Sequence, residues 1–404
     1  MNFYEFEFSD EVLDALDAMN FQECTPIQEK TIPVILQGRD LIACAQTGTG
    51  KTAAFLLPLI NLLSTGKYPE DAINCLIISP TRELAQQIDR QMEGFSYFVP
   101  VSSIPVYGGT SGDGFIRQQH ALKAGADMVI ATPGRLLDHI KMGYVDLSRV
   151  SFLVLDEADR MLDMGFFEDI MRIVKLLPSR CQRLMFSATM PPKTRMLASR
   201  LLNKPVQVNI AVSRPKENIK QLCCFCPETE KLQKLREILV SHDLQKVIVF
   251  TSSKKNAGKI SYELRRACLK ASEMHSDLEQ TQREKVLNDF KAGKIDILVA
   301  TDILSRGIDI ENISLIVNYD VPCDYEDYVH RIGRTARAGA EGTAVTLVSS
   351  KDNSRFFRLE KILGNKIERL SFDQPKITKN SFHRRRQRPY HKSVNKSNDK
   401  PKKS

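Results

Sequence analysis

A glycine-rich segment that ends in lysine and threonine is the first place in the sequence where chemistry is expected. It follows an apolar run and opens a helix-forming stretch at 51–63. The glycines allow successive backbone N–H groups to face phosphate oxygens, and the start of a helix adds the positive end of its dipole. We expect Lys51 to reach the β- and γ-phosphates and Thr52 to ligate Mg²⁺. The predicted phosphate-binding residues are Ala45, Gln46, Thr47, Gly48, Thr49, Gly50, Lys51 and Thr52.

A second chemical signal is the acidic run 156–159, which directly follows the apolar run 152–155. Carboxylates at the carboxyl end of a parallel strand face the ligand crevice of an open α/β sheet. Asp156 is therefore expected to hold Mg²⁺, while Glu157 orients and deprotonates the attacking water. Together with the glycine-rich segment, this run indicates a nucleoside triphosphatase.

Two arginines in the second half could complete such a site. A helix is predicted over about 325–337, and Arg334 and Arg337 lie three residues apart, on one face of it. Guanidinium groups stabilise the charge that spreads during γ-phosphoryl transfer. The alternative is that these arginines form surface salt bridges, with Glu326, Asp327 or Glu341.

Alternation of β-branched runs with amphipathic helical patterns predicts an α/β fold with two parallel sheets. At 404 residues the chain is too long for one domain. We expect one domain over 1–210, a linker over 211–218, a second domain over 219–370 and a disordered basic tail over 371–404. The expected strands are Asp40–Gln46, Asn74–Ser79, Asp127–Thr132, Phe152–Glu157, Arg183–Thr189, Lys246–Ser252, Ala271–His275, Asp296–Asp302, Leu315–Asp320 and Gly342–Ser349.

Composition narrows the class of protein. No apolar run approaches the roughly 20 residues that span a bilayer, and the acidic, aromatic N-terminus is unlike a secretory signal. Nine scattered cysteines in such a chain indicate reduced thiols. The cluster Cys223, Cys224 and Cys226 is either half of a metal site or a buried cysteine-rich strand.

Charge is concentrated at the C-terminus. Residues 375–404 contain eleven lysines and arginines and one acid, so they carry more than the whole chain's net charge of +9. A polycation of this kind binds nucleic acid by releasing counterions, without reading sequence. The tail is therefore expected to tether RNA, and the alternative is a solubilising or localisation segment.

The acidic run and its neighbouring motifs resemble the DEAD-box family of superfamily 2 helicases, of bacterial type, over roughly residues 3–350. The resemblance implies two tandem RecA-like domains, ATP and Mg²⁺ as cofactors, and an ATP-dependent RNA helicase. It also implies that Gln28 selects adenine, that Phe3 stacks on the adenine ring (with Phe6 or Phe8 as alternatives), and that Asp309 holds the ribose.

Further motifs of the family suggest how RNA is bound. The residues that the resemblance places on RNA are Pro80, Thr81, Arg82, Gly109, Thr132, Gly134, Arg135, Thr251, Gln280, Arg283 and Thr301. The residues that it implies in coupling nucleotide state to strand separation are Ser187, Thr189 and His330. Two family glycines are replaced here, by Asn20 and Ala336.

We therefore expect RNA-stimulated ATP hydrolysis coupled to local, non-processive duplex unwinding and to RNA–protein remodelling, in the cytoplasm. Contacts to RNA are expected mainly at phosphate and sugar, with little sequence preference. Three alternatives remain open at this stage: an ATP-gated RNA clamp without useful unwinding, a DNA-directed translocase of the same superfamily, and a scaffold without ATPase activity.

Overall fold

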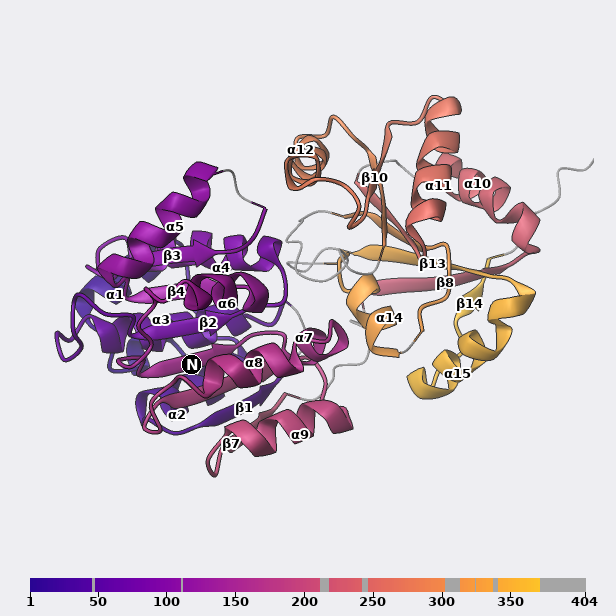
Figure 1. Cartoon of the computed structure of the whole chain (residues 1–404). Helices are drawn as coiled ribbons and strands as arrows, with labels where there is room; N and C mark the ends of the chain where they lie inside the picture. The colour runs from indigo at the N-terminus through magenta and orange to yellow at the C-terminus, as the bar shows by residue number, and fades with distance from the viewer. Residues whose placement is uncertain are drawn as a thin grey trace, which may run out of the picture. The chain divides into compact units, whose positions relative to one another are not determined.

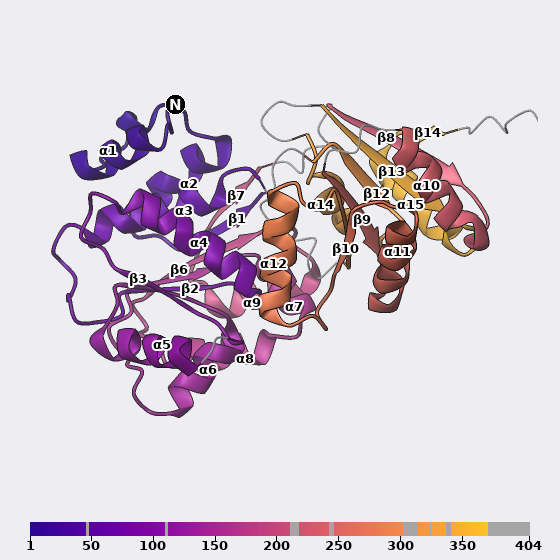
Figure 2. The same cartoon turned by 90° about the horizontal axis from the view of Figure 1, so that it is seen from above.

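Two parallel β-sheets organise the chain, each covered by helices on both faces (Figures 1 and 2). The structure is a computed structural model, and it describes residues 1–45, 48–109, 112–210, 218–241, 246–301, 313–323, 325–336 and 341–370. Residues Met1–Arg369 form one compact unit. Each of the two sheets belongs to one domain. The fold is therefore α/β with two tandem RecA-like domains, as the sequence predicts.

The first sheet has seven parallel strands in the order β3-β4-β2-β5-β6-β1-β7. Its central strand, β5, pairs with β2 and β6, for example through Leu155 opposite Ile78 and Met185. Because all seven strands run in one direction, the segments that follow them gather at one edge of the sheet. The strands are β1 Leu41–Cys44, β2 Cys75–Ile78, β3 Ser103–Val106, β4 Met128–Ala131, β5 Phe152–Leu155, β6 Gln182–Ser187 and β7 Val206–Asn209.

Helices α1–α4 pack on one face of this sheet and α5–α9 on the other (Figure 2). Successive residues of a strand point to opposite faces, so Ala43 and Val154 enter the core beneath α1–α4, while Ile42 and Leu153 enter the opposite core. The helices are α1 Asp10–Ala18, α2 Pro26–Leu36, α3 Lys51–Leu63, α4 Arg82–Phe95, α5 Gly112–Ala124, α6 Pro133–Lys141, α7 Ala158–Asp163, α8 Phe167–Val174 and α9 Pro192–Leu201, and the short 3₁₀ helix η1 Phe3–Glu5 precedes them.

The second sheet repeats the architecture, with the strand order β10-β11-β9-β12-β13-β8-β14 and every pair parallel. Its strands are β8 Ile219–Phe225, β9 Val247–Thr251, β10 Ala271–Met274, β11 Ile297–Thr301, β12 Leu315–Asn318, β13 Gly342–Val348 and β14 Glu368–Arg369. The carboxyl ends of β9, β12 and β13 therefore lie at one edge. That edge carries the polar residues described below.

Helices α14 and α15 supply large apolar side chains to one core of this sheet, among them Tyr328 and Phe356. The other face is covered by α10 and α11, whose Leu235 and Leu264 are fully buried. The helices are α10 Lys231–Ser241, α11 Lys254–Arg266, α12 Gln280–Lys291, α14 Tyr325–Ile332 and α15 Asn353–Leu363, with the short 3₁₀ helices η2 Glu228–Glu230 and η3 Ser350–Asp352.

All ten strands expected from the sequence are present, as β1, β2, β4, β5, β6 and β9–β13. Four strands are not among the expected ones: β3, β7, β8 and β14. Three of these are sheet edges, and β3 contains Pro105, which an edge strand tolerates because it needs no ladder hydrogen bond on its open side. Cys223 and Cys224 are buried in β8, in agreement with the buried-strand interpretation of the cysteine cluster.

The helix predicted over about 325–337 is too long. Helix α14 ends at Ile332, and Gly333 and Arg334 follow in a turn. The backbone of Ala336 has a φ of 54°, in the left-handed region, and Thr335 bridges to Ile313 instead of continuing the helix. The prediction that Arg334 and Arg337 share a helical face is therefore wrong for Arg334, which lies beyond the helix end.

Candidate nucleotide and RNA sites

The phosphate-loop lysine lies where the sequence predicts it. Lys51 is the first residue of α3 and is buried, and its Nζ donates a hydrogen bond of 2.8 Å to the carbonyl oxygen of Ala45. Gly50, just before it, has a φ of 89°, a conformation open to glycine at little cost. The amine is thus held at the start of α3, against the carbonyl oxygen of Ala45.

Gln28 is fastened to the same loop. Its Nε2 donates to the carbonyl oxygen of Gly50 at 3.1 Å, and its Oε1 accepts from the backbone N–H of Thr25 at 2.8 Å. The second bond is part of a capping box at the start of α2. One hydrogen bond therefore joins Gln28, which is predicted to select adenine, to Gly50, which is predicted to bind phosphate.

The carboxylates of Asp156 and Glu157 are buried at the carboxyl end of β5. Glu157 has a φ of 51°, which is unfavourable for a residue with a Cβ and is characteristic of functional sites that the surrounding fold holds in place. Its Oε2 accepts from Arg160 Nη1 at 3.1 Å. Arg160 is a residue that the sequence analysis missed, although it stands next to the acidic run.

The pKa values of the two carboxylates are shifted in opposite directions. Burial raises the pKa of Asp156 to about 7, against the lowering influence of Lys51. Burial also acts to raise the pKa of Glu157, but the charges of Arg160 and Lys51 outweigh it and hold that pKa below its usual range. Glu157 is therefore ionised at neutral pH, as a base must be.

The donor set fits a magnesium ion. Thr52 and Asp156 line the same small cavity, of about 190 Å³. Mg²⁺ commonly uses one or two protein oxygens and keeps several waters. A buried carboxylate whose pKa is raised to about 7 also gains most from a nearby cation. Thr52 and Asp156 are thus suited to hold the ion.

Arg334 lines this cavity together with Gln28, Lys51 and Glu157. It is buried, and its Nε donates to the carbonyl oxygen of His330 at 3.3 Å. Its positive charge also contributes to the low pKa of Glu157. A lysine, two carboxylates and an arginine from three separate segments therefore converge on one cavity.

The aromatic side chain of this cavity is Phe21. Phe3, which the family resemblance places on adenine, is only 1% exposed and packs against Phe6 and Phe21 with ring centroids 6.4 Å apart in each case. Phe6 and Phe8 are buried too. Stacking of Phe3 on adenine stays a prediction, and Phe21 is the ring that borders the cavity.

The acidic run is bonded to the segment that the resemblance assigns to coupling. Asp159 Oδ2 accepts from the backbone N–H of Thr189 at 2.9 Å and from its hydroxyl at 2.8 Å. Ser187 Oγ accepts from the Asp159 backbone N–H at 3.3 Å and donates to the carbonyl oxygen of Thr189 at 2.7 Å. A shift of the acidic run would therefore move Thr189 directly.

A second cavity, of about 400 Å³, collects most of the residues predicted to contact RNA. Those lining it are Pro80, Thr81, Arg82, Thr132, Gly134, Arg135 and Arg283, and Gly108 lines it as well. Gly109 is adjacent, and a Cβ there would lie 2.0 Å from Arg82 Nη1, so the guanidinium packs directly on that glycine. Arginines and small polar residues of this kind suit phosphate and sugar.

Gln118, which was not predicted from the sequence, is hydrogen-bonded to Arg135 of this cavity. Its Nε2 donates to the carbonyl oxygen of Tyr107 at 3.1 Å, and its Oε1 accepts from Arg135 Nε at 3.2 Å and from His139 Nε2 at 3.0 Å. Tyr144 donates its hydroxyl hydrogen to His139 Nδ1. Desolvation, with a contribution from Arg135, lowers the pKa of His139 to about 4.

Other predicted RNA residues are already engaged within the protein. Arg283 Nη1 lies 2.8 Å from Glu83 Oε1. The hydroxyl of Thr251 is fully buried and donates to Asp320, and Thr301 is buried as well. Their contacts with RNA stay predictions, which for Thr251 would have to use the backbone or a rearranged side chain.

The remaining predicted residues are divided between a third cavity and the undescribed parts of the chain. His330 and Thr189 both line a cavity of about 930 Å³. Gln46, Thr47, Asp309, Arg337, the side chain of Gln280, residues 211–217 of the predicted linker and the tail 371–404 lie outside what the structure describes.

Comparison with known proteins agrees with this geometry. The DEAD/DEAH box helicase domain matches residues 25–197, and the helicase conserved C-terminal domain matches residues 230–339. The DEAD-box ATP-dependent RNA helicase CshA of Geobacillus kaustophilus is 41% identical over 91% of this chain and 78% of its own length. The chain belongs to the DEAD-box family of ATP-dependent RNA helicases.

Other DEAD-box proteins are similar over most of the chain. The DEAD-box ATP-dependent RNA helicase RhpA of Helicobacter pylori is 41% identical over 94% of this chain and 76% of its own length. The structure of S. cerevisiae Dbp5 bound to RNA and ADP BeF3 matches with a TM-score of 0.82 and 31% identity, and the match covers 91% of this chain and 95% of that one.

Asn20 and Ala336, where the family resemblance expects glycine, have similar backbone conformations. Asn20 has a φ of 57° and Ala336 has a φ of 54°. Glycine enters this region without steric cost, asparagine enters it more readily than most residues, and alanine does so with strain. Both positions therefore have a backbone conformation that glycine would adopt at less cost than the residue found here.

Proposed function

We propose that this DEAD-box helicase couples RNA-stimulated ATP hydrolysis to local, non-processive RNA unwinding and RNA–protein remodelling. The observation that carries the proposal is the cavity shared by Gln28, Lys51, Asp156, Glu157 and Arg334. It contains a group for each demand of γ-phosphoryl transfer: base recognition, phosphate binding, activation of water and charge stabilisation.

In this mechanism Gln28 reads the edge of adenine. Lys51 gives up its bond to the carbonyl oxygen of Ala45 and pairs with the β- and γ-phosphates. Glu157, kept ionised by Arg160 and Lys51, orients the attacking water and accepts its proton. Arg334, with Arg337, neutralises charge on the transferred phosphoryl group.

Mg²⁺ held by Thr52 and Asp156 would neutralise phosphate charge when bound. On the protein side, the hydrogen bonds from Thr189 to Asp159 offer a route from the acidic run to the coupling segment Ser187–Thr189. Thr189 of that segment and His330 line the third cavity, and we assign Ser187, Thr189 and His330 to coupling rather than to the reaction itself.

The RNA path is proposed along the second cavity, where Arg82 and Arg135 offer guanidinium groups beside small residues. Such a surface holds the backbone and leaves sequence unread. Preference for RNA over DNA is assigned to contacts with the 2′-hydroxyl. A cytoplasmic location is kept as a prediction; among the described residues, none of the helices has the length and apolarity to cross a membrane.

Strand displacement tests the unwinding step. Two RNA duplexes with the same single-stranded extension, one short and one several times longer, would be mixed with enzyme and ATP. Each base step costs roughly 1–2 kcal/mol to open, so a non-processive enzyme separates the short duplex and leaves the long one paired. Separation of both would contradict local unwinding, and separation of neither, with ATP still hydrolysed, would favour an RNA clamp.

The basic tail is proposed as an RNA tether. Deleting residues 375–404 removes eleven of the chain's 58 lysines and arginines. RNA affinity should then fall and depend less steeply on salt, because fewer counterions are released on binding. The hydrolysis rate at saturating RNA should not change. An unchanged affinity at low salt would rule out the tether and leave a solubilising or localisation role.

A further inference from the structure

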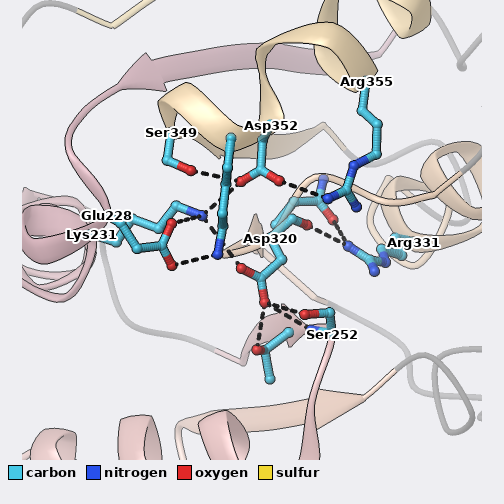
Figure 3. A network of polar contacts seen from close by, with 11 residues as sticks. Glu228, Lys231, Ser252, Asp320, Arg331, Ser349, Asp352 and Arg355 are labelled. Carbon is cyan, nitrogen blue, oxygen red and sulfur yellow. Dashed lines mark hydrogen bonds and ion pairs between the residues drawn. The ribbon is translucent and has the colours of Figure 1, made fainter.

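A buried carboxylate in the second domain holds the turn after β9. Asp320, just beyond β12, accepts at Oδ2 from the Thr251 hydroxyl at 2.8 Å, from the Ser252 backbone N–H at 2.8 Å and from the Ser252 hydroxyl at 2.9 Å. Figure 3 shows these bonds converging on one oxygen. Bonds to a carboxylate are stronger than bonds between neutral groups, so the turn is firmly attached to Asp320.

The other oxygen of Asp320 faces a fully buried lysine. Lys231 Nζ lies 3.4 Å from Asp320 Oδ1, 3.0 Å from Asp352 Oδ2 and 3.2 Å from Glu228 Oε2. Burial acts to lower the pKa of Lys231, but its carboxylate partners raise it above the usual value. The lysine is therefore charged, and it fixes the Asp320 carboxylate from the side opposite the turn.

The backbone of Asp320 is bonded to α14. Arg331 Nη1 donates to the Asp320 carbonyl oxygen at 2.9 Å and to Asn318 Oδ1 at 3.1 Å, and Arg331 is buried against Phe250. Arg331 directly follows His330, whose carbonyl oxygen accepts from Arg334. One residue thus contacts the turn at Thr251–Ser252 through its side chain and the arginine-bearing segment through its main chain (Figure 3).

These contacts join two regions with different partners. Thr251 belongs to the predicted RNA surface, and Arg334 lines the nucleotide cavity. Everything between them, namely Asp320, Lys231 and Arg331, lies in the second domain and is buried. Buried ion networks lose much of their stability when one member is removed, because its partners remain charged without compensation. We therefore expect the contacts between Thr251–Ser252 and the Arg334 segment to be held firmly in place.

We propose that Asp320, locked by Lys231, is a positioning residue that ties the RNA-side turn at Thr251–Ser252 to the α14 segment carrying Arg334. Through it, RNA bound at the turn fixes the orientation of the arginine segment, and a loosened turn weakens RNA stimulation. This inference rests on the proposed RNA-stimulated ATPase.

The test compares KM for RNA, KM for ATP and the RNA-stimulated kcat in Asp320→Asn, Lys231→Met and the double variant. Asp320→Asn keeps the side-chain shape but removes the charge and one acceptor oxygen. We expect KM for RNA to rise about tenfold, which is the effect of losing one hydrogen bond to a charged group, with KM for ATP within about twofold of wild type. The double variant should be no worse than the poorer single variant, because Lys231 acts through Asp320.

Two further variants keep the outcome interpretable. Asp296→Asn removes the acid of a partly exposed pair with Lys270, 3.8 Å apart, and should leave KM for RNA unchanged. If Asp320→Asn does not fold, Ser252→Ala removes only the 2.9 Å hydroxyl bond and should raise KM for RNA by about two- to threefold. Thermal melting of each variant reports whether it is folded.

An unchanged KM for RNA in a folded Asp320→Asn and in Ser252→Ala would overturn the inference. Equal rises in KM for RNA and for ATP would overturn it too, because they would indicate a general structural role. If wild-type protein shows no RNA stimulation at all, it is the proposed function that fails. The wild-type control therefore separates the two failures.

Discussion

The guanidinium of Arg160 lies 3.1 Å from the carboxylate of Glu157, and both side chains are almost fully buried. The pair spans one turn, from the residue before α7 to the third residue of that helix. It has two consequences. It keeps the proposed base charged. It also offsets the cost of burying Glu157 next to a second carboxylate, Asp156.

Replacing Arg160 should destabilise the protein. Arg160→Met leaves Glu157 buried without its partner, and removal of one member of a buried ion pair costs about 3–5 kcal/mol. Urea unfolding of the isolated variant measures this loss. Arg172→Met is the matched control, since Arg172 and Asp169 form an exposed pair of the same spacing at 3.6 Å. That change should cost less than about 1 kcal/mol, and equal losses in the two variants would contradict the role of burial.

Replacing the base should stop turnover and spare binding. Glu157→Gln keeps the shape of the side chain but cannot accept a proton, and general-base catalysis contributes about 10²–10⁴-fold to rate. We expect single-turnover hydrolysis to fall within this range, while a fluorescent ATP analogue binds as it does to wild type and a stable RNA complex accumulates. Glu168→Gln, an exposed acid in α8, should hydrolyse ATP normally. Normal hydrolysis by Glu157→Gln would remove Glu157 from the mechanism.

Two glycines with similar backbone angles should respond differently to alanine. Gly50 has a φ of 89°, and a Cβ on it would lie 2.5 Å from Gln28 Nε2, whereas Gly38 has a φ of 71° and nothing within 4 Å. Gly38→Ala should cost only the strain of its backbone, about 1–2 kcal/mol, with ATP affinity unchanged. Gly50→Ala displaces Gln28 and should weaken ATP binding by at least about tenfold. Calorimetric titration with ATP distinguishes the two, and equal affinities would show that the contact is unimportant.

Local sequence was sufficient for ten of the fourteen strands that the structure describes and for much of the candidate site. Lys51 and Glu157 were predictable because each follows an apolar strand in a short characteristic segment, and parallel strands bring such segments to one edge. The Lys231–Asp320–Asp352 network was not predictable, because its members are far apart in sequence and each alone looks like an ordinary solvated charge. The end of α14 was misjudged, because Gly333 and the left-handed conformation of Ala336 gave a weaker signal than the run of arginines.

Stability should depend on pH through His139. Its ring nitrogens contact Gln118 and Tyr144, and desolvation with the nearby charge of Arg135 lowers its pKa to about 4, below the usual 6.5. Between pH 6.5 and pH 4, His139 is protonated in the unfolded chain and neutral in the folded protein. Stability from this residue is therefore complete above pH 6.5 and is lost as pH falls toward 4.

The measurement is the unfolding free energy between pH 7 and pH 4.5. His139→Gln should reduce its pH dependence by up to about 1.4 kcal/mol per pH unit, which corresponds to one proton. His120→Gln, at an exposed position of α5, should keep the wild-type slope. An unchanged slope in His139→Gln would show that this histidine is not the titrating group.

The most direct test of the whole account is the rate of ATP hydrolysis measured alone, with single-stranded RNA and with DNA of the same sequence. The account predicts a low rate alone, strong stimulation by RNA and little by DNA. Equal stimulation by DNA would contradict the assignment of RNA as the substrate. No stimulation by either would contradict the coupling between the nucleotide cavity and the RNA surface.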